Sequence, residues 1–365
     1  MFAMSLLACK PNADETLDRL RLFYSRGAGD QIFAAFTIPS PALKEFAATS
    51  PEGLCVYPDP DERIRFWDRY LREWAVLEDD SIPVAALSEF DQGLYGGVLG
   101  GEVRFNCNPE TGWISSMVVP LLKDWSEFKD LRFDERHPWL QRYERQMDRF
   151  VRGARGRFGI GHVILINGLN FAFELVGATE TYAAMIDDSE TLREAMELGL
   201  TVNRSIQQRF FSHIPLLEGG TCSSGAQWIP GRVIAESVDP FHMTSVDYFE
   251  AWGRPVTERI MAEYDGGITH LHGNGRHLLE AVCTIKGLKG LILGDDKGYP
   301  AALDVADDLR ARSGDTPLVM VTSHDRFVDK LNRHTLPGGV LYLVNGTPDA
   351  ATANRCMETV RTYRC

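Results

Sequence analysis

The stretch from Gly266 to Asp296 constrains the fold of this 365-residue chain more than any other. A short apolar segment ends at His270 and His272, and a turn rich in glycine and a helix-length segment follow. A second apolar segment then ends at Asp295 and Asp296. A strand, a helix and another strand of this length form a βαβ unit with parallel strands. Both polar clusters are therefore expected at the carboxyl ends of neighbouring strands, where α/β enzymes hold their active sites.

The rest of the chain repeats the same pattern of apolar strand and following helix. Continuous apolar strands, rather than alternating ones, are typical of a parallel sheet covered by helices. Eight such strands close a TIM barrel, and no Gly-x-Gly-x-x-Gly follows any of them to favour a doubly wound sheet. We therefore predict one α/β domain over 1–365, a (β/α)8 TIM barrel with a helical extension at about 12–28 and an inserted hairpin and helical segment at about 100–150. Besides the two strands of the opening unit, the predicted strands are 31–38, 82–87, 162–169, 214–217, 318–322 and 339–344.

Composition limits the partners and the compartment. The formal net charge of −13 argues against nucleic acid or an anionic membrane as the main partner, since both attract basic surfaces. No apolar run reaches the roughly 18 residues that a membrane span needs. Seven cysteines without a Cys-x-x-Cys pair are typical of reduced thiols in the cytoplasm, so a cytoplasmic location is expected. A homodimer is compatible with the sequence.

The two histidines are the first candidates for catalysis and for binding a metal. Residues two apart on a strand share a face, so His270 and His272 can both face the mouth of the barrel. Neutral imidazoles in that arrangement hold zinc at about 2.1 Å. Glu218 and Cys222, after the preceding strand, and Asp296, after the following one, are the natural additional groups. The alternative is a site without metal, in which the imidazoles bond to carboxylates and to substrate oxygens.

Other polar residues follow predicted strands. His324, after the seventh strand, is a candidate acid or base because an imidazole titrates near neutral pH. The link from about 220 to 245 is long for a loop without structure, and such loops are often lids or binding loops. The residues that we expect to bind substrate are Asp91, Asn167, Arg232, Asp239 and Asn345.

Four phrases, in this order and spacing, resemble the uroporphyrinogen decarboxylase superfamily over most of the chain. They are Ser-Val-Asp-Pro-Phe-His-Met-Thr-Ser (237–245), Gly-Ile-Thr-His-Leu-His-Gly-Asn (267–274), Ile-Lys-Gly-Leu-Lys-Gly-Leu-Ile-Leu-Gly-Asp (285–295) and Asn-Gly-Thr-Pro (345–348). The resemblance implies a TIM barrel. It also implies one of two activities, decarboxylation of a tetrapyrrole or methyl transfer with a corrinoid protein.

The chain departs from both activities in particular residues. True decarboxylases of the superfamily have an arginine-rich loop after the first strand, whereas Pro39-Ser40-Pro41-Ala42-Leu43 follows it here. Zinc-dependent methyltransferases of the superfamily have His-x-Cys at the fifth-strand position and a further cysteine near the last strand. In this chain His270 matches the histidine, His272 replaces the cysteine, and the last strand offers Gly338 and Gly339. The cysteine-containing zinc site of those methyltransferases is therefore not expected.

The resemblance to the methyltransferase branch gives our prediction of function. The chain is expected to demethylate a small methylated ether, amine or thioether and to pass the methyl group to a corrinoid protein. His270 and His272, with Glu218 or Asp296, would hold zinc or a proton beside the leaving heteroatom. Two alternatives stay open: a decarboxylase or lyase of a small acid that uses Arg232, Arg276 or Arg326, and a corrinoid- or tetrapyrrole-binding protein without turnover.

Overall fold

A computed structural model describes residues 7–162, 166 and 168–365 of the chain. Its largest element is a six-stranded sheet in which all neighbouring strands run parallel. Its strands are largely apolar, and all five residues of the first one are buried. This is the parallel α/β architecture that continuous apolar strands predict. The order is β1 (Ile32–Phe36), β13 (Val340–Asn345), β12 (Leu318–Ser323), β11 (Leu288–Leu293), β10 (Gly267–Leu271) and β9 (Ile234–Ser237).

A second sheet has four strands, in the order β3 (Val84–Ala86), β6 (Gly159–His162), β7 (Gly220–Ser223) and β8 (Gln227–Pro230). Its first three strands are parallel, and β8 returns antiparallel to β7. At the β1 edge, side chains take the place of a neighbouring strand: the amides of Ala34 and Phe36 donate to the carboxylates of Asp80 and Asp79. The parallel strands of the described residues thus belong to two separate sheets, and closure into one eight-stranded barrel stays a prediction.

The fourth strand begins later in the chain than the sequence predicted. Residues 214–217 are not a strand, because helix α8 (Ser189–His213) extends to this point and Ile214 is its C-cap. A turn through Glu218 and Gly219, both with positive φ, then leads into β7. The link over about 220–245, predicted as a long loop, contains β7, β8 and β9. It is therefore largely sheet.

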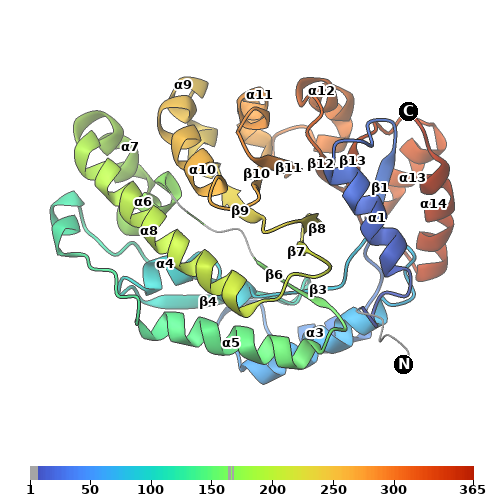
Figure 1. Cartoon of the computed structure of the whole chain (residues 1–365), viewed down its shortest axis with the longest axis horizontal. Coiled ribbons are helices and arrows are strands. Elements are labelled where there is room, and N and C mark those ends of the chain that lie inside the picture. The colour runs from blue at the N-terminus through green and yellow to red at the C-terminus, as the bar shows by residue number, and fades with distance from the viewer. Residues whose placement is uncertain (1–6, 163–165, 167) are drawn as a thin grey trace.

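Helices cover the outer side of the large sheet. Figure 1 shows α10 to α14 as an arc outside β9–β13, with α3 and α5 on the opposite side of the molecule. The helix α1 occupies the predicted N-terminal extension. The helices are α1 (Ala13–Tyr24), α2 (Pro41–Thr49), α3 (Pro60–Glu73), α4 (Gly93–Gly97), α5 (Pro138–Ala154), α6 (Leu169–Val176), α7 (Ala178–Asp187), α8, α9 (Val246–Tyr248), α10 (Arg254–Met261), α11 (Leu279–Cys283), α12 (Ala306–Arg312), α13 (His324–Asn332) and α14 (Ala350–Thr362).

Shorter helical turns follow several strands. The 3-10 turns are η1 (Ser88–Phe90), η2 (Trp125–Asp130), η3 (Asp239–Met243), η5 (Gly273–Leu278) and η6 (Ala302–Val305), and η4 (Phe249–Gly253) is a π-helical turn. Two of them, η3 and η5, directly follow β9 and β10 and pack against each other. Among the helices of the described residues, none has the length and apolar character needed to cross a bilayer.

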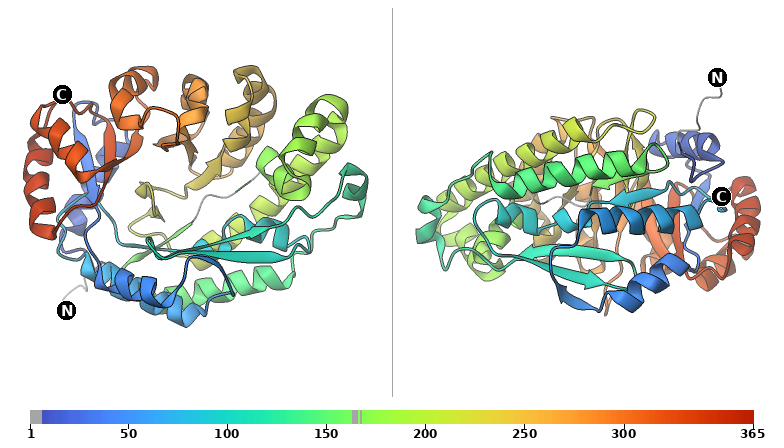
Figure 2. Two further views of the ribbon diagram at one scale, coloured as in Figure 1. Left: turned by 180° about the vertical axis from the view of Figure 1, so that it is seen from behind. Right: turned by 90° about the horizontal axis from the view of Figure 1, so that it is seen from below.

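The insertion predicted over about 100–150 contains a hairpin and a helix. The hairpin is β4 (Val103–Asn108) and β5 (Trp113–Val118), and β2 (Gly53–Cys55) pairs antiparallel with β4 to make a third sheet. Figure 2 shows this small sheet on the inner side of α3 and α5. The strand β5 packs against η1 and α4, which follow β3. The insertion therefore reaches the carboxyl end of β3.

Candidate functional site

Three side chains with metal-binding atoms converge at the carboxyl ends of β9 and β10. Asp239 begins η3, His270 belongs to β10, and His272 follows the last residue of that strand. One ligand atom from each residue lies within 4.8 Å of those of the other two. Nε2 of His270 lies 2.8 Å from Oδ1 of Asp239, and Nε2 of His272 lies 3.9 Å from the same oxygen. The parallel register of β9 and β10 produces this meeting, since His270 pairs with Ser237.

Asp296 fixes the orientation of one imidazole. Its Oδ1 lies 3.1 Å from Nδ1 of His272, and its Oδ2 accepts a hydrogen bond from the backbone N–H of Asn274 at 3.3 Å. With Nδ1 directed at Asp296, Nε2 of His272 is left for the cluster. A carboxylate on the far nitrogen of an imidazole fixes the tautomer and strengthens the other nitrogen as a metal ligand. Asp296 is therefore a positioning residue in this arrangement.

The local electrostatics keep both carboxylates ionised. Burial disfavours the charge on Asp239, but the imidazole of His270 and its neighbours outweigh it and lower the pKa of Asp239 below its usual value. Burial also acts to raise the pKa of Asp296, but His272 and backbone N–H groups outweigh this effect and lower the pKa of the carboxyl. Burial lowers the pKa of His242, whose Nδ1 lies 3.6 Å from Oδ1 of Asp239, to about 4. The cluster is thus an anion surrounded by imidazoles, one of which is neutral at pH 7.

Oδ1 of Asp239 is the atom on which the imidazoles converge. It is buried, and no described residue donates a hydrogen bond of good geometry to it, although three imidazole nitrogens lie within 3.9 Å. A buried carboxylate oxygen without a donor is costly unless a cation completes its surroundings. Two imidazoles and one carboxylate are also a donor set that zinc accepts. The residues therefore fit a bound metal ion.

The cluster forms one wall of a cavity of about 480 Å³. This volume suits a small-molecule substrate. Polar groups are few outside the cluster: Asp91 and Gln92, which follow η1, the serines at the end of β7, and Ser237 of β9. Trp113 of β5 closes another side. The remaining walls are mainly aliphatic and come from strands of the two larger sheets and their ends: Ile166, Ala235, Ile268, Ile292, Val321 and Leu343.

Asp91 is an unusual acid within this cavity. Burial raises the pKa of Asp91 to about 7, and burial together with the nearby Asp91 raises the pKa of Glu174, on α6, to about 7. Such values are typical of acids and bases that work at neutral pH. The structure therefore brings Asp91, which the sequence predicted as a substrate-binding residue, into the same cavity as Asp239, His270 and His272.

Three of the predicted site residues lie away from the cluster. Glu218 is exposed in the turn before β7, on the amino-terminal side of that strand. Cys222 points into the core against Gly159, and burial raises the pKa of its thiol to about 12, which disfavours the thiolate that binds metals. Arg232 is exposed before β9 and pairs its backbone with Asp265. The structure therefore does not bring Glu218 and Cys222, predicted as metal ligands, to the cluster. The same correction applies to Arg232, predicted as a substrate ligand.

Two further predicted residues do not meet the cluster either. His324 begins α13 after β12 and Asn345 ends β13, and neither lines the cavity among the described residues. The side chain of Asn345 accepts a hydrogen bond from Thr37 at 3.3 Å. Asn167 lies outside the described residues. The arginines considered for an acidic substrate, Arg276 and Arg326, form ion pairs with Asp295 and Asp304.

Sequence reasoning missed Trp113 and Glu174 and gave His242 no role. Trp113 lies in the inserted hairpin, whose local pattern gives no sign that it reaches the cavity. Glu174 is one charged residue in an otherwise apolar helix segment, which is a usable signal. His242 lies three residues after Asp239, and its ring packs so closely against Gly275 that a side chain there would overlap it. This contact holds η3 against η5 beside the cluster.

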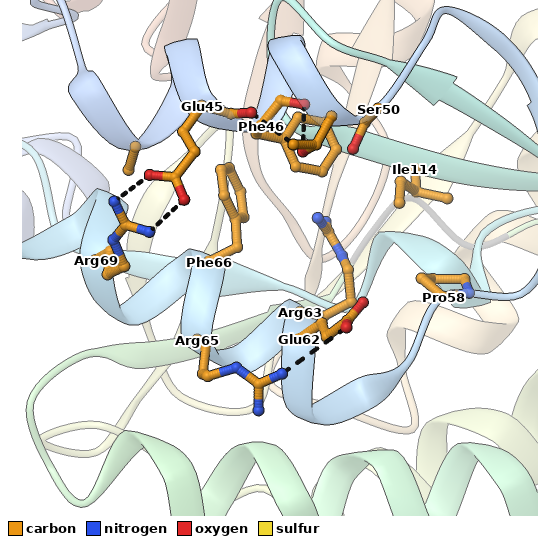
Figure 3. A pocket seen from close by; sticks show the side chains of 12 residues that line it. Glu45, Phe46, Ser50, Pro58, Glu62, Arg63, Arg65, Phe66, Arg69 and Ile114 are labelled. Carbon is orange, nitrogen blue, oxygen red and sulfur yellow. Dashed lines mark hydrogen bonds and ion pairs between the residues drawn. The ribbon is translucent and has the colours of Figure 1, made fainter.

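Another cavity, of about 500 Å³, lies between α2 and α3 (Figure 3). Its charged side chains are largely paired with each other: Arg69 contacts Glu45, and Arg65 lies 4.0 Å from Glu62. Arg63 forms a buried ion pair with Glu89 and lies over the ring of Phe66. No group of metal-binding side chains converges there among the described residues. We therefore place the candidate active site at the Asp239 cluster.

Comparison with known proteins finds matches among solved structures. The fold is similar to that of a solved methyltransferase from Methanosarcina mazei, with a TM-score of 0.57 and 12% sequence identity. The match covers 98% of this chain and 99% of the other. No protein-family model matches the sequence, and no curated protein matches it. At this identity the likeness concerns the fold.

Proposed function

We propose that this chain is a methyltransferase that removes the methyl group of a small methylated substrate and passes it to a corrinoid protein. The observation that carries the proposal is the convergence of Asp239, His270 and His272 on one cavity at the carboxyl ends of parallel strands. A fold similar to that of a solved methyltransferase, matched along nearly the whole chain, supports the same class. The resemblance of the sequence to corrinoid-dependent methyltransferases supports the corrinoid protein as methyl acceptor.

The residues that would hold a metal ion are Asp239, His270 and His272. Zinc fits a set of two imidazoles and one carboxylate that leaves a position for substrate. Zinc in that place supplies Lewis-acid polarisation of the heteroatom that carries the methyl group. Because Asp296 holds Nδ1 of His272 and His242 packs against η5, the donor atoms are positioned before substrate arrives.

The chain's own residues prepare the substrate for methyl transfer. The aliphatic walls exclude water from the methyl group and strengthen the electrostatic contacts within the cavity. When an ether or an amine loses its methyl group, the heteroatom becomes basic and needs a proton or another positive charge. A metal ion held by Asp239, His270 and His272 would supply that positive charge. The substrate heteroatom would therefore lie beside the Asp239 cluster.

Methyl transfer to free cobalamin tests the proposal. Zinc-loaded protein is mixed with cob(I)alamin and a panel of methyl ethers, methylamines and methyl thioethers, and methylcobalamin is followed by absorbance. We expect methylcobalamin with at least one class, and a background rate for His270→Ala. Asp325→Asn, an exposed residue outside the cavity, serves as the matched control and keeps the wild-type rate. Release of CO₂ from small carboxylic acids, without methyl transfer from any compound, would contradict the proposal and favour a decarboxylase.

A further inference from the structure

The cavity contains a carboxylate without a counter-charge. Three fully buried acids elsewhere in the chain have cationic partners, whereas Asp91 is partly buried: Asp79 pairs with Lys10, Asp80 with Arg19, and Glu89 with Arg63. For Asp91, no ion pair with lysine or arginine occurs among the described residues, and its charge adds to burial in raising the pKa of another acid, Glu174. Unpaired acids in a desolvated place are costly and are usually kept for function.

The described lining of the cavity contains no lysine or arginine. Its charged groups are the carboxylates of Asp91 and Asp239 and the imidazoles of the cluster. A bound divalent ion would compensate Asp239 but leaves Asp91 at the other wall. An anionic substrate group near Asp91 would be repelled, whereas a cation would be attracted. The uncompensated charge therefore selects for a positive group in that part of the substrate.

An aromatic ring accompanies this carboxylate. Trp113 lines the same cavity, and its strand β5 packs directly against η1, which ends one residue before Asp91. The approach is tight, because a Cβ added to Gly93 would lie 2.7 Å from Cβ of Ser116 in β5. Tryptophan provides the best aromatic face for an organic cation. A carboxylate and a tryptophan that line one cavity with aliphatic walls suit an alkylammonium group better than a strongly hydrated metal ion.

We propose that the substrate is a methylated compound with an ammonium group, which binds between Asp91 and Trp113 while the methyl-bearing heteroatom faces Asp239, His270 and His272. The position of the methyl-bearing heteroatom rests on the proposed function, and the ammonium site does not. A cavity of about 480 Å³ has room for a molecule with both groups. The inserted hairpin, which supplies Trp113, would then determine specificity.

A matched pair of probes tests the ammonium site by binding alone. The cation is the methyl ether of choline, and the neutral analogue is 1-methoxy-3,3-dimethylbutane, in which carbon replaces the charged nitrogen. Affinities are measured by calorimetry at pH 8 with zinc-loaded protein. We expect the cation to bind at least about tenfold more tightly. Asp91→Asn should reduce this ratio to less than about threefold, Trp113→Leu should reduce it as well, and Asp325→Asn should leave it unchanged.

Several results would overturn the ammonium site. These are equal affinity of the two probes, no binding of either probe, or a ratio that Asp91→Asn leaves unchanged in a protein whose melting curve shows it to be folded. Loss of a bound metal equivalent in Asp91→Asn without a change in the ratio would show that the acids hold a metal ion instead. Methyl transfer is not part of this test. If the cation binds more tightly in an Asp91-dependent way but no methyl transfer occurs, the proposed function alone is refuted. If methyl transfer occurs but the two probes bind equally, the ammonium site alone is refuted.

Discussion

Nε2 of His270 lies 2.8 Å from Oδ1 of Asp239, although 31 positions separate the two residues in the chain. The parallel pairing of β9 with β10 creates this contact, because it aligns Ser237 with His270 and places the following turn over the strand end. His272 and Asp296 extend the arrangement to the end of β11. The candidate site thus combines the ends of three neighbouring strands, which is the usual way in which a parallel sheet assembles an active site.

Asp296→Asn tests the positioning of His272. Loss of the carboxylate behind a metal-binding imidazole typically lowers metal affinity about 10- to 100-fold. We expect this decrease for zinc, measured by competition with a chromogenic chelator. The amount of zinc bound at saturation should stay the same, because the three ligands remain. Asp325→Asn is the control, and unchanged affinity in Asp296→Asn would contradict a role of this residue in orienting the imidazole.

Gly275→Ala tests the packing of His242 beside the cluster. The added methyl group would overlap the His242 ring, which is buried and has little room to move. Overpacking of this kind usually destabilises a protein by about 1–3 kcal/mol. We expect a loss in this range by urea denaturation, and weaker zinc binding. Gly29→Ala, where no atom lies within 4 Å of the added group, should be close to neutral.

The stability of the wild-type protein should depend on Asp91 through pH. Burial raises the pKa of this carboxyl to about 7, above its value in the unfolded chain, so between about pH 4 and 7 the folded state holds a proton that the unfolded state has lost. Stability from this group is therefore present below pH 4 and is lost as the pH rises to 7. We expect Asp91→Asn to be more stable than the wild type by up to about 4 kcal/mol at pH 8, with no gain at pH 4. Urea denaturation at both pH values measures the difference, and a less stable variant at pH 8 would contradict the assignment.

The ion pair of Lys10 and Asp79 should be important for the edge of β1. Both side chains are buried, with a distance of 2.7 Å, and Asp79 also accepts a hydrogen bond from the backbone N–H of Phe36. Removing one partner of a buried pair typically costs about 3–5 kcal/mol. We expect Lys10→Ala to lose this amount. Arg65→Ala, which breaks an exposed pair with Glu62, should lose less than about 1 kcal/mol by the same thermal or urea measurement.

The sequence located the two histidines of the candidate cluster, but it did not show that Asp239 joins them. The apolar run before His270 and His272 marked a strand end, and the structure has both residues there. Asp239 was expected to contact substrate, on the strength of the family phrase around it. Its contact with the imidazoles was missed because the preceding strand β9 lay in a segment that resembled a long loop. Only the pairing of β9 with β10 shows that Asp239 faces the imidazoles. Contacts between distant segments depend on register, which local patterns do not encode.

One strand was predicted too early in the chain, and two predicted metal ligands were therefore assigned to the wrong position. The apolar residues 214–217 resembled a strand, so Glu218 and Cys222 were placed after its carboxyl end. In the structure the strand is β7, and these two residues lie before it and within it. Trp113 could not be predicted, because its contribution to the cavity depends on how the inserted hairpin folds back over β3. The parallel α/β class followed from strand composition alone.

Zinc content is the most direct test of the claim that Asp239, His270 and His272 form a metal centre. The purified chain, without an affinity tag, is analysed for metals after growth with zinc and removal of loosely bound ions. We predict about one zinc per chain in the wild type and in His324→Ala, and almost none in Asp239→Ala or His270→Ala. Wild-type protein that binds no zinc, or zinc that persists in both of these variants, would contradict the account.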